Sequence, residues 1–171
     1  MIEGDAVVVR LRLEQPPEVV FDFFVDPAKL VRWIGIGAEL DPRPGGRFRF
    51  EVAPGEYCEG RYVDVVRPSR VVFTWGWTDP VMGVPPGSSQ VAVDLVADAA
   101  GTEVTLVHSG LPSDDARLLH DDGWARFTAR LVAVSAGSEP PAYPTGDPSA
   151  RVVDLRATEP DPPSGGSGSA G

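Results

Sequence analysis

The feature that most constrains the fold is a series of short segments in which apolar and polar residues alternate. Alternation of this kind places every second side chain on one face of a β-strand. Between these segments lie Pro-Gly, Gly-Gly and Arg-Pro-Ser sequences, which are turn signals. The expected strands, in chain order, cover residues 7–13, 47–52, 57–66, 71–77, 90–98 and 102–109. Consecutive strands joined by short turns form an antiparallel meander.

Helical periodicity is confined to three places. Two short helices are predicted after the first strand, at 18–24 and 28–33, with prolines near their starts and Asp26 as an N-cap. One long helix is predicted over 114–135, where apolar residues recur at intervals of three or four. This helix is the only element able to cover one face of the sheet. The sequence therefore predicts an α+β fold.

Composition divides the chain near residue 137. Residues 138–171 contain seven prolines and five glycines, and they end in PPSGGSGSAG, which is typical of flexible linkers. We expect one domain at 1–137 and a Pro/Gly-rich tail at 138–171 that is disordered towards its end. Within the tail, a short edge strand or a surface-packed segment at residues 151–155 is the less favoured alternative to an unstructured chain.

Charge and cysteine content exclude several classes of protein. The net charge is −10 at pH 7, which opposes binding to nucleic acids and to anionic membranes. Cys58 is the only cysteine, so an internal disulfide framework and a cysteine-rich zinc site are excluded. No run approaches the roughly 20 apolar residues that span a bilayer, and the first residues do not resemble a secretory signal. We expect a cytoplasmic protein.

Five segments together carry a resemblance to a known family. They are PPEVVFDFFVDPAKLVRW (16–33), GGRFRF (45–50), EGRYVDVVRPSRVVFTWGW (59–77), GTEVTLVHSGLP (101–112) and HDDGWARFTARL (120–131). In this order they resemble the activator-of-Hsp90-ATPase-homologue (AHSA1-like) family of the START-like, or Bet v 1-like (SRPBCC), superfamily. The resemblance covers about residues 5–134.

The resemblance implies a helix-grip fold. In such a fold a curved antiparallel sheet of about six to seven strands surrounds a long C-terminal helix, and two short helices follow the first strand. An apolar cavity lies between the sheet and the long helix. The family takes its name from a eukaryotic co-chaperone in which this domain accompanies a second, Hsp90-binding domain, so the name alone does not fix an activity.

Aromatic side chains are dense at positions that alternation and helical spacing turn inward. Aromatic walls with a few polar groups are typical of small-molecule sites, but the same side chains can instead fill a solid core. The resemblance favours the cavity. With one tyrosine and two histidines as polar anchors, the candidate ligand-binding residues are Trp33, Phe50, Tyr62, Phe73, Trp75, Trp77, His108, His120, Trp124 and Phe127.

His108 and His120 are the only histidines, and both are predicted to reach the cavity mouth. A neutral imidazole there can act as a general acid or base or as a hydrogen-bond anchor, although a structural role near the rim is the simpler interpretation. A metal site formed by the two histidines with Asp121 or Asp122 has no supporting motif. We therefore expect no bound metal and no cofactor, and we assign no catalytic residue. Gly123, which costs about 1 kcal/mol relative to Ala in a helix, indicates close packing against the sheet, room for the indole of Trp124, or space for a ligand.

Three functions are compatible with these observations. The first is binding of a small hydrophobic or aromatic molecule in the cavity, for carriage, sensing or sequestration. The second is catalysis, because cyclases, aromatases and dehydratases occur on related helix-grip folds and a pocket histidine can supply acid–base chemistry. The sequence lacks a paired acid and base at suitable spacing, so binding is favoured over an enzyme. The third is a protein-interaction role, as an Hsp90-co-chaperone-like module or as a homodimer. None of the three involves a nucleic acid, a membrane or a cofactor.

Overall fold

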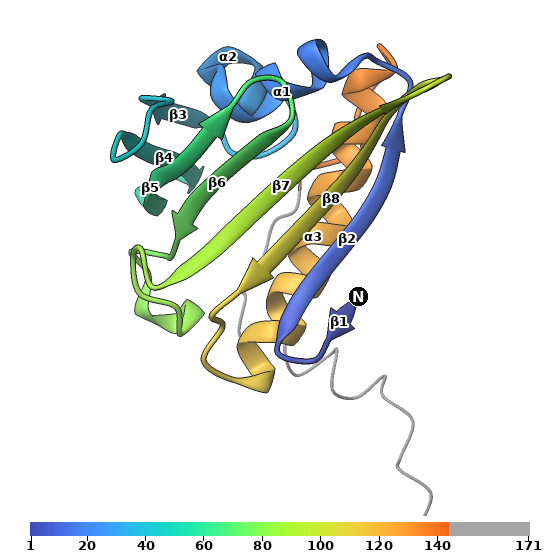
Figure 1. Cartoon of the computed structure of the whole chain (residues 1–171). Coiled ribbons are helices and arrows are strands. Elements are labelled where there is room, and N and C mark those ends of the chain that lie inside the picture. Colours follow the sequence, from blue (N-terminus) through green and yellow to red (C-terminus); the bar gives the residue numbers. More distant parts are fainter. Residues whose placement is uncertain (144–171) are drawn as a thin grey trace, which may run out of the picture.

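The alternating segments all join one sheet. In the computed structural model, which describes residues 1–143, the sheet has eight antiparallel strands in the order β1-β2-β8-β7-β6-β5-β4-β3 (Figure 1). In chain order the strands are β1 (Ile2–Glu3), β2 (Ala6–Leu13), β3 (Gly37–Leu40), β4 (Arg47–Ala53), β5 (Glu56–Val66), β6 (Arg70–Trp75), β7 (Ser89–Asp98) and β8 (Gly101–Ser109). From β4 to β8 each strand pairs with the next along the chain, so the predicted meander is confirmed.

Two strands, β1 and β3, are absent from the sequence-based prediction. They contain two and four residues, which is too short for alternation to be visible. The strand predicted at 71–77 ends at Trp75, and Trp77 pairs through an isolated bridge to Cys58. The sheet therefore has eight strands instead of six to seven, and the predicted α+β architecture is confirmed.

Two of the three α-helices begin at a side-chain N-cap, one of which is the predicted Asp26. They are α1 (Pro17–Val25), α2 (Pro27–Leu30) and α3 (Asp114–Ser135), with a 3-10 turn at Pro80–Met82. Asp26 caps α2 and Ser113 caps α3, each through a side-chain oxygen that accepts backbone N–H groups. The helix predicted to reach residue 33 ends at Leu30 and continues as a turn. Within residues 1–143, none of the helices is long and apolar enough to cross a membrane.

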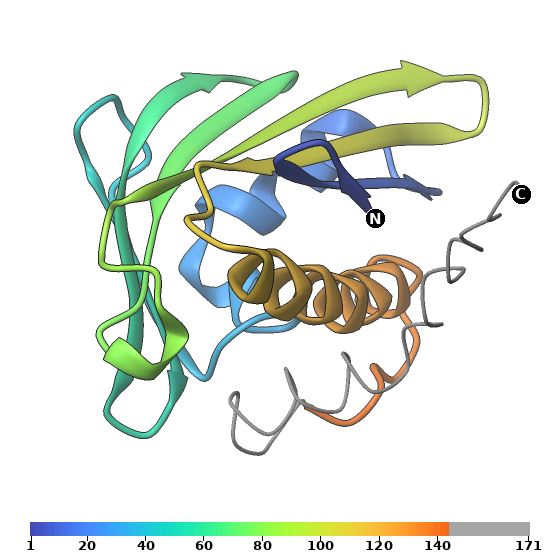
Figure 2. The same cartoon turned by 90° about the horizontal axis from the view of Figure 1, so that it is seen from below.

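Two register shifts bend the sheet. One lies between β4 and β5 at residues 51–53, and the other lies between β5 and β6 at residues 62–64. Irregularities of this kind bend and twist a pair of strands. Figure 2 shows the sheet arching over α3, which lies along its concave side. The helices α1 and α2 lie at one end of the arch (Figure 1), so the arrangement is that of a helix-grip fold.

The chain that follows α3 folds back onto the domain. Arg130 of α3 is buried and donates hydrogen bonds to the backbone carbonyls of Trp33, at 3.1 Å, and of Pro141. The hydroxyl oxygen of Tyr143 accepts a hydrogen bond from the backbone N–H of Gly35 at 2.9 Å. Both interactions join this segment to the turn after α2.

The predicted domain boundary at residue 137 lies just beyond the end of α3. Residues 138–143 nevertheless remain in contact with the domain through the two interactions described above. The predicted segment 151–155 and the predicted disordered end lie outside the described residues.

Candidate functional site

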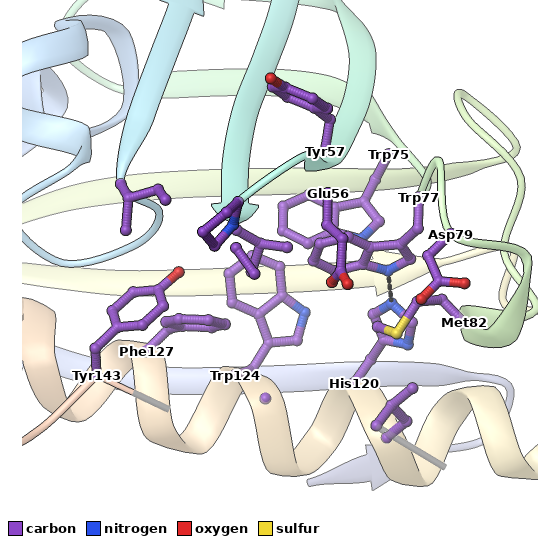
Figure 3. Close-up of a pocket in the computed structure, with 16 residues that line it drawn as sticks. Glu56, Tyr57, Trp75, Trp77, Asp79, Met82, His120, Trp124, Phe127 and Tyr143 are labelled. Atoms are coloured by element: carbon purple, nitrogen blue, oxygen red, sulfur yellow. Dashed lines mark hydrogen bonds between the residues drawn. The ribbon is translucent and has the colours of Figure 1, made fainter. Parts of the chain in front are cut away.

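A cavity of about 440 Å³ lies between one end of the sheet and α3. Its walls come from the β4–β5 hairpin, the end of β6 with the loop that follows, and the middle of α3 (Figure 3). One residue before β3 and one after α3 complete the described lining. Apolar and aromatic side chains make up most of this lining. Cavities of this size and composition are typical of small-molecule sites.

Five of the ten candidate residues line the cavity. They are Trp75, Trp77, His120, Trp124 and Phe127. The other five are buried outside its lining, namely Trp33, Phe50, Tyr62, Phe73 and His108. Alternation places the strand residues of both groups on the inner face of the sheet. It does not indicate where along the strands space is left between the sheet and the helix.

Two of the aromatic residues outside the cavity hold α1 in place. The indole Nε1 of Trp33 donates to the carbonyl of Phe23 at 3.0 Å, and the hydroxyl of Tyr62 donates to the carbonyl of Phe24 at 2.8 Å. Both carbonyls belong to the last turn of α1, where helical hydrogen-bond partners are missing. In the described structure these two polar groups therefore support the fold.

His108 is held in a single neutral form behind the cavity wall. The indole Nε1 of Trp124 donates to Nδ1 of His108 at 3.1 Å, so the ring proton resides on Nε2, which donates to Oγ of Ser89 at 2.8 Å. The Ser89 hydroxyl donates in turn to the carbonyl of Trp75 at 3.0 Å. Burial lowers the pKa of His108 well below its usual value, and the neighbouring His120 lowers it further.

His120 lines the cavity, yet both of its ring nitrogens are also occupied. The indole Nε1 of Trp77 donates to Nε2 at 2.9 Å, drawn as a dashed line in Figure 3, and Nδ1 donates to the carbonyl of Ala116 at 2.7 Å. Burial lowers the pKa of His120 to about 4. Because the lone pair of each histidine already accepts an indole N–H, neither is free to take a proton from a bound molecule. This geometry disfavours histidine acid–base catalysis in the cavity.

Trp75 differs from the other two tryptophans of the lining in its hydrogen bonding. Its indole N–H is buried and has no acceptor among the residues that the structure describes. The ring packs against Trp77, with centroids 5.2 Å apart, and against Trp124, with centroids 5.0 Å apart. A buried donor without a partner costs about 1–3 kcal/mol. Trp75 therefore contributes area and shape to the wall, and its N–H adds nothing to the stability of the fold.

This difference can be measured with a matched pair of variants. Trp33 and Trp75 are each 2 % exposed, but only Trp33 donates a hydrogen bond. We expect Trp33→Phe to lower the free energy of unfolding by about 1–2 kcal/mol more than Trp75→Phe, because the first variant leaves a buried carbonyl without its donor. Urea unfolding of both variants measures the difference. An equal loss, or a larger loss for Trp75→Phe, contradicts the expectation.

Gly123 leaves the helix side of the cavity open. It stands in the middle of α3 and lines the cavity. No heavy atom outside its immediate helical surroundings lies within 4 Å of the position that a Cβ would occupy. Close packing against the sheet, the first interpretation of this glycine, is therefore wrong. The other two interpretations, room for the indole of Trp124 and space for a ligand, stay predictions.

Most of the remaining lining is absent from the sequence-based prediction. These residues are Ile36, Val52, Ala53, Pro54, Glu56, Tyr57, Asp79, Met82, Leu119 and Tyr143. Ala53, Pro54, Glu56, Asp79 and Met82 lie at the turn of the β4–β5 hairpin or in the loop after β6, where the sequence shows turn signals and no periodicity. Leu119 was detectable, because it lies one helical turn before Gly123 on the apolar stripe of α3.

The charged groups of the described lining are both acidic. They are Glu56 and Asp79, and no lysine or arginine of residues 1–143 lines the cavity. Figure 3 places both carboxylates at the end of the cavity where Trp77, Met82 and His120 lie. With His120 neutral, this end of the cavity carries negative charge at pH 7.

The sequence matches one protein family over most of its length. Residues 14–136 match the family described as Activator of Hsp90 ATPase homolog 1-like protein (AHSA1). The matched range extends just past the end of α3, so it includes the sheet and helix walls of the cavity but not Tyr143. No curated protein matches the chain in sequence.

Several solved structures resemble this one. An AHSA1-like protein from Rhizobium etli is 37 % identical, with a TM-score of 0.63, and the match covers 86 % of this chain and 94 % of that one. DynU16, from the dynemicin biosynthetic locus, is 23 % identical, with a TM-score of 0.68 over 80 % of this chain, which spans about half (49 %) of that protein. The Aha1 dimer from Colwellia psychrerythraea is 16 % identical, with a TM-score of 0.64 over 78 % of this chain and 96 % of that one. The last two likenesses show the fold alone.

Proposed function

The chain belongs to the family of activator of Hsp90 ATPase homolog 1-like proteins, and we propose that it binds a small apolar ring compound in the cavity between the sheet and α3. The observation that carries the proposal is the open space beside Gly123, in a cavity whose walls include three tryptophans. Protein interiors are normally packed without large voids. A large unfilled space among aromatic side chains therefore supports a bound molecule, which the protein carries, senses or sequesters.

The lining favours binding over turnover. Catalysis by a pocket histidine needs a lone pair or a proton that is available to the substrate. The Nε2 lone pair of His120 accepts from Trp77, and its Nδ1 proton is donated to Ala116. His108 is committed in the same way behind Trp124. A molecule in this cavity should therefore be returned unchanged, which product analysis after incubation measures directly.

The protein-interaction alternative keeps two predictions open. The Colwellia relative is a dimer, and a homodimer of this chain is a prediction that sedimentation of the purified protein tests. An Hsp90-co-chaperone-like role is tested by binding to purified bacterial Hsp90. A cytoplasmic location is part of the proposed function, and it is supported by the single thiol, Cys58, which is buried and unpaired.

Native mass spectrometry of the freshly purified protein tests ligand binding first. We expect a stoichiometric small molecule that solvent extraction releases and that its mass identifies as a ring compound. If the protein is empty, titration with the neutral probe 9-anthracenemethanol follows, read by the fluorescence of the wall tryptophans. We expect saturable quenching with a stoichiometry of one. An empty protein that also fails to bind this probe contradicts the proposed function.

A further inference from the structure

We propose that the ligand of this cavity is a ring compound that carries a protonated amine, and that the cavity rejects molecules with a free carboxylate. The inference rests on the proposed function, because it concerns which molecules enter the same cavity. It begins with the charges of the lining. In the described lining, two carboxylates, Glu56 and Asp79, stand without a lysine or an arginine beside them.

Neither carboxylate is neutralised by a cation within the described part of the chain. The ion pairs of residues 1–143 involve neither Glu56 nor Asp79. Asp79 uses Oδ1 to accept the backbone N–H of Val81 at 2.9 Å, which leaves Oδ2 for another donor. The Glu56 side chain is exposed and lies at the same end of the cavity (Figure 3).

The histidines do not supply the missing positive charge. Nε2 of His120 accepts the indole N–H of Trp77. In a positively charged ring Nε2 would carry a proton of its own, which would face that N–H and break the hydrogen bond. His108 is held neutral by the equivalent contact with Trp124. An anion that entered the cavity would therefore meet two carboxylates and none of the lysines or arginines of residues 1–143, and the net charge of −10 adds repulsion of the same sign.

A cation at this end of the cavity gains two kinds of attraction. The first is Coulombic attraction to Glu56 and Asp79, which is strengthened where water is excluded. The second is attraction to the face of an aromatic ring such as that of Trp77, which lines the cavity. The ring body of the ligand then occupies the open space beside Gly123. The proposed ligand therefore has an aromatic body beside Gly123 and a positively charged group near Glu56 and Asp79.

Three probes with one ring system test the charge selection. They are 9-anthracenemethylamine, 9-anthracenemethanol and 9-anthracenecarboxylate, titrated at pH 7.5 and low salt. We expect the amine to bind about tenfold or more tightly than the carboxylate, with the alcohol between them. We also expect added salt to narrow the difference, because salt screens charges at an exposed mouth.

Two double variants that change the net charge by the same amount distinguish the local effect of Glu56 and Asp79 on binding from the effect of the protein's overall charge. Glu56→Gln with Asp79→Asn should remove the preference for the amine. The control, Glu18→Gln with Glu103→Gln, changes two exposed residues outside the cavity lining and should keep it.

Equal binding of the three probes overturns the charge selection and leaves the proposed function standing. Tightest binding of the carboxylate also overturns it. An equal loss of preference in both double variants does so as well, because it assigns the effect to net charge. If none of the probes binds to protein that native mass spectrometry shows to be empty, the proposed function fails, and the charge selection fails with it.

Discussion

Lowering the pH from 6.5 to 4 is expected to remove about 3 kcal/mol of stability through His120 alone. The unfolded chain takes up a proton at a histidine pKa of about 6.5, whereas burial in the folded protein lowers the pKa of His120 to about 4. The stabilising difference is fully present above pH 6.5 and is lost as the pH falls, at about 1.4 kcal/mol per pH unit. His108, whose pKa is also lowered by burial, adds a loss in the same direction.

Urea unfolding at pH 7.5, 6.5, 5.5 and 5 measures the first part of this loss, about 2 kcal/mol between pH 6.5 and 5. The window lies above the range in which carboxylates such as Glu39 titrate, because hydrogen bonds from Arg47 hold the pKa of Glu39 below its usual value. In His120→Gln the dependence on pH should fall by about half, since one of two titrating groups is removed. A free energy of unfolding that stays constant from pH 7.5 to 5 would show that the histidines take up protons in the folded protein as readily as in the unfolded chain, against the hydrogen-bond pattern described here.

Replacing Gly123 by Leu is expected to weaken ring-compound binding by about tenfold or more without unfolding the protein. The side chain would extend from open space into the cavity, where overlap with a ligand costs about 1–3 kcal/mol. The helix itself should be stabilised, because glycine in a helix interior is about 1 kcal/mol worse than alanine. Titration with 9-anthracenemethanol and thermal unfolding measure the two effects separately.

Gly123→Ala is the matched control for this variant. Its single methyl group meets no neighbouring atom, so we expect a gain in stability of about 1 kcal/mol with only a small change in probe affinity. A Gly123→Leu protein that binds the probe as tightly as wild type places the ligand elsewhere. A Gly123→Ala protein that is less stable than wild type indicates that the glycine has a structural role.

The sheet and the long helix could be predicted because their signals span many residues. Alternation over β4 to β8 and the three-to-four spacing of α3 each repeat several times. The short strands β1 and β3 have no such repetition, and pairing with neighbouring strands defines them. The continuation of α2 to residue 33 was also wrong, because local spacing does not indicate where the chain must turn towards β3.

The cavity could be predicted only in part, for a similar reason. Trp75 and Phe73 have the same strand parity and both are buried, yet only Trp75 lines the cavity. Periodicity indicates on which face of the sheet a side chain lies. It does not indicate how far along the strand the side chain is from the end of the sheet where the cavity lies. Glu56 and Asp79 come from a hairpin and a loop, where sequence patterns indicate a turn but not which side chains meet across it.

Tyr143 gives this cavity a wall from outside the region that defines the family. The family match ends at residue 136, whereas Tyr143 lines the cavity and is fixed by its hydrogen bond from Gly35. Substitutions in residues 138–143 can therefore reshape the cavity while the sheet and α3 stay unchanged. Under the proposed function, exchange of this short segment is therefore a route by which ligand preference can change while the region that defines the family stays the same.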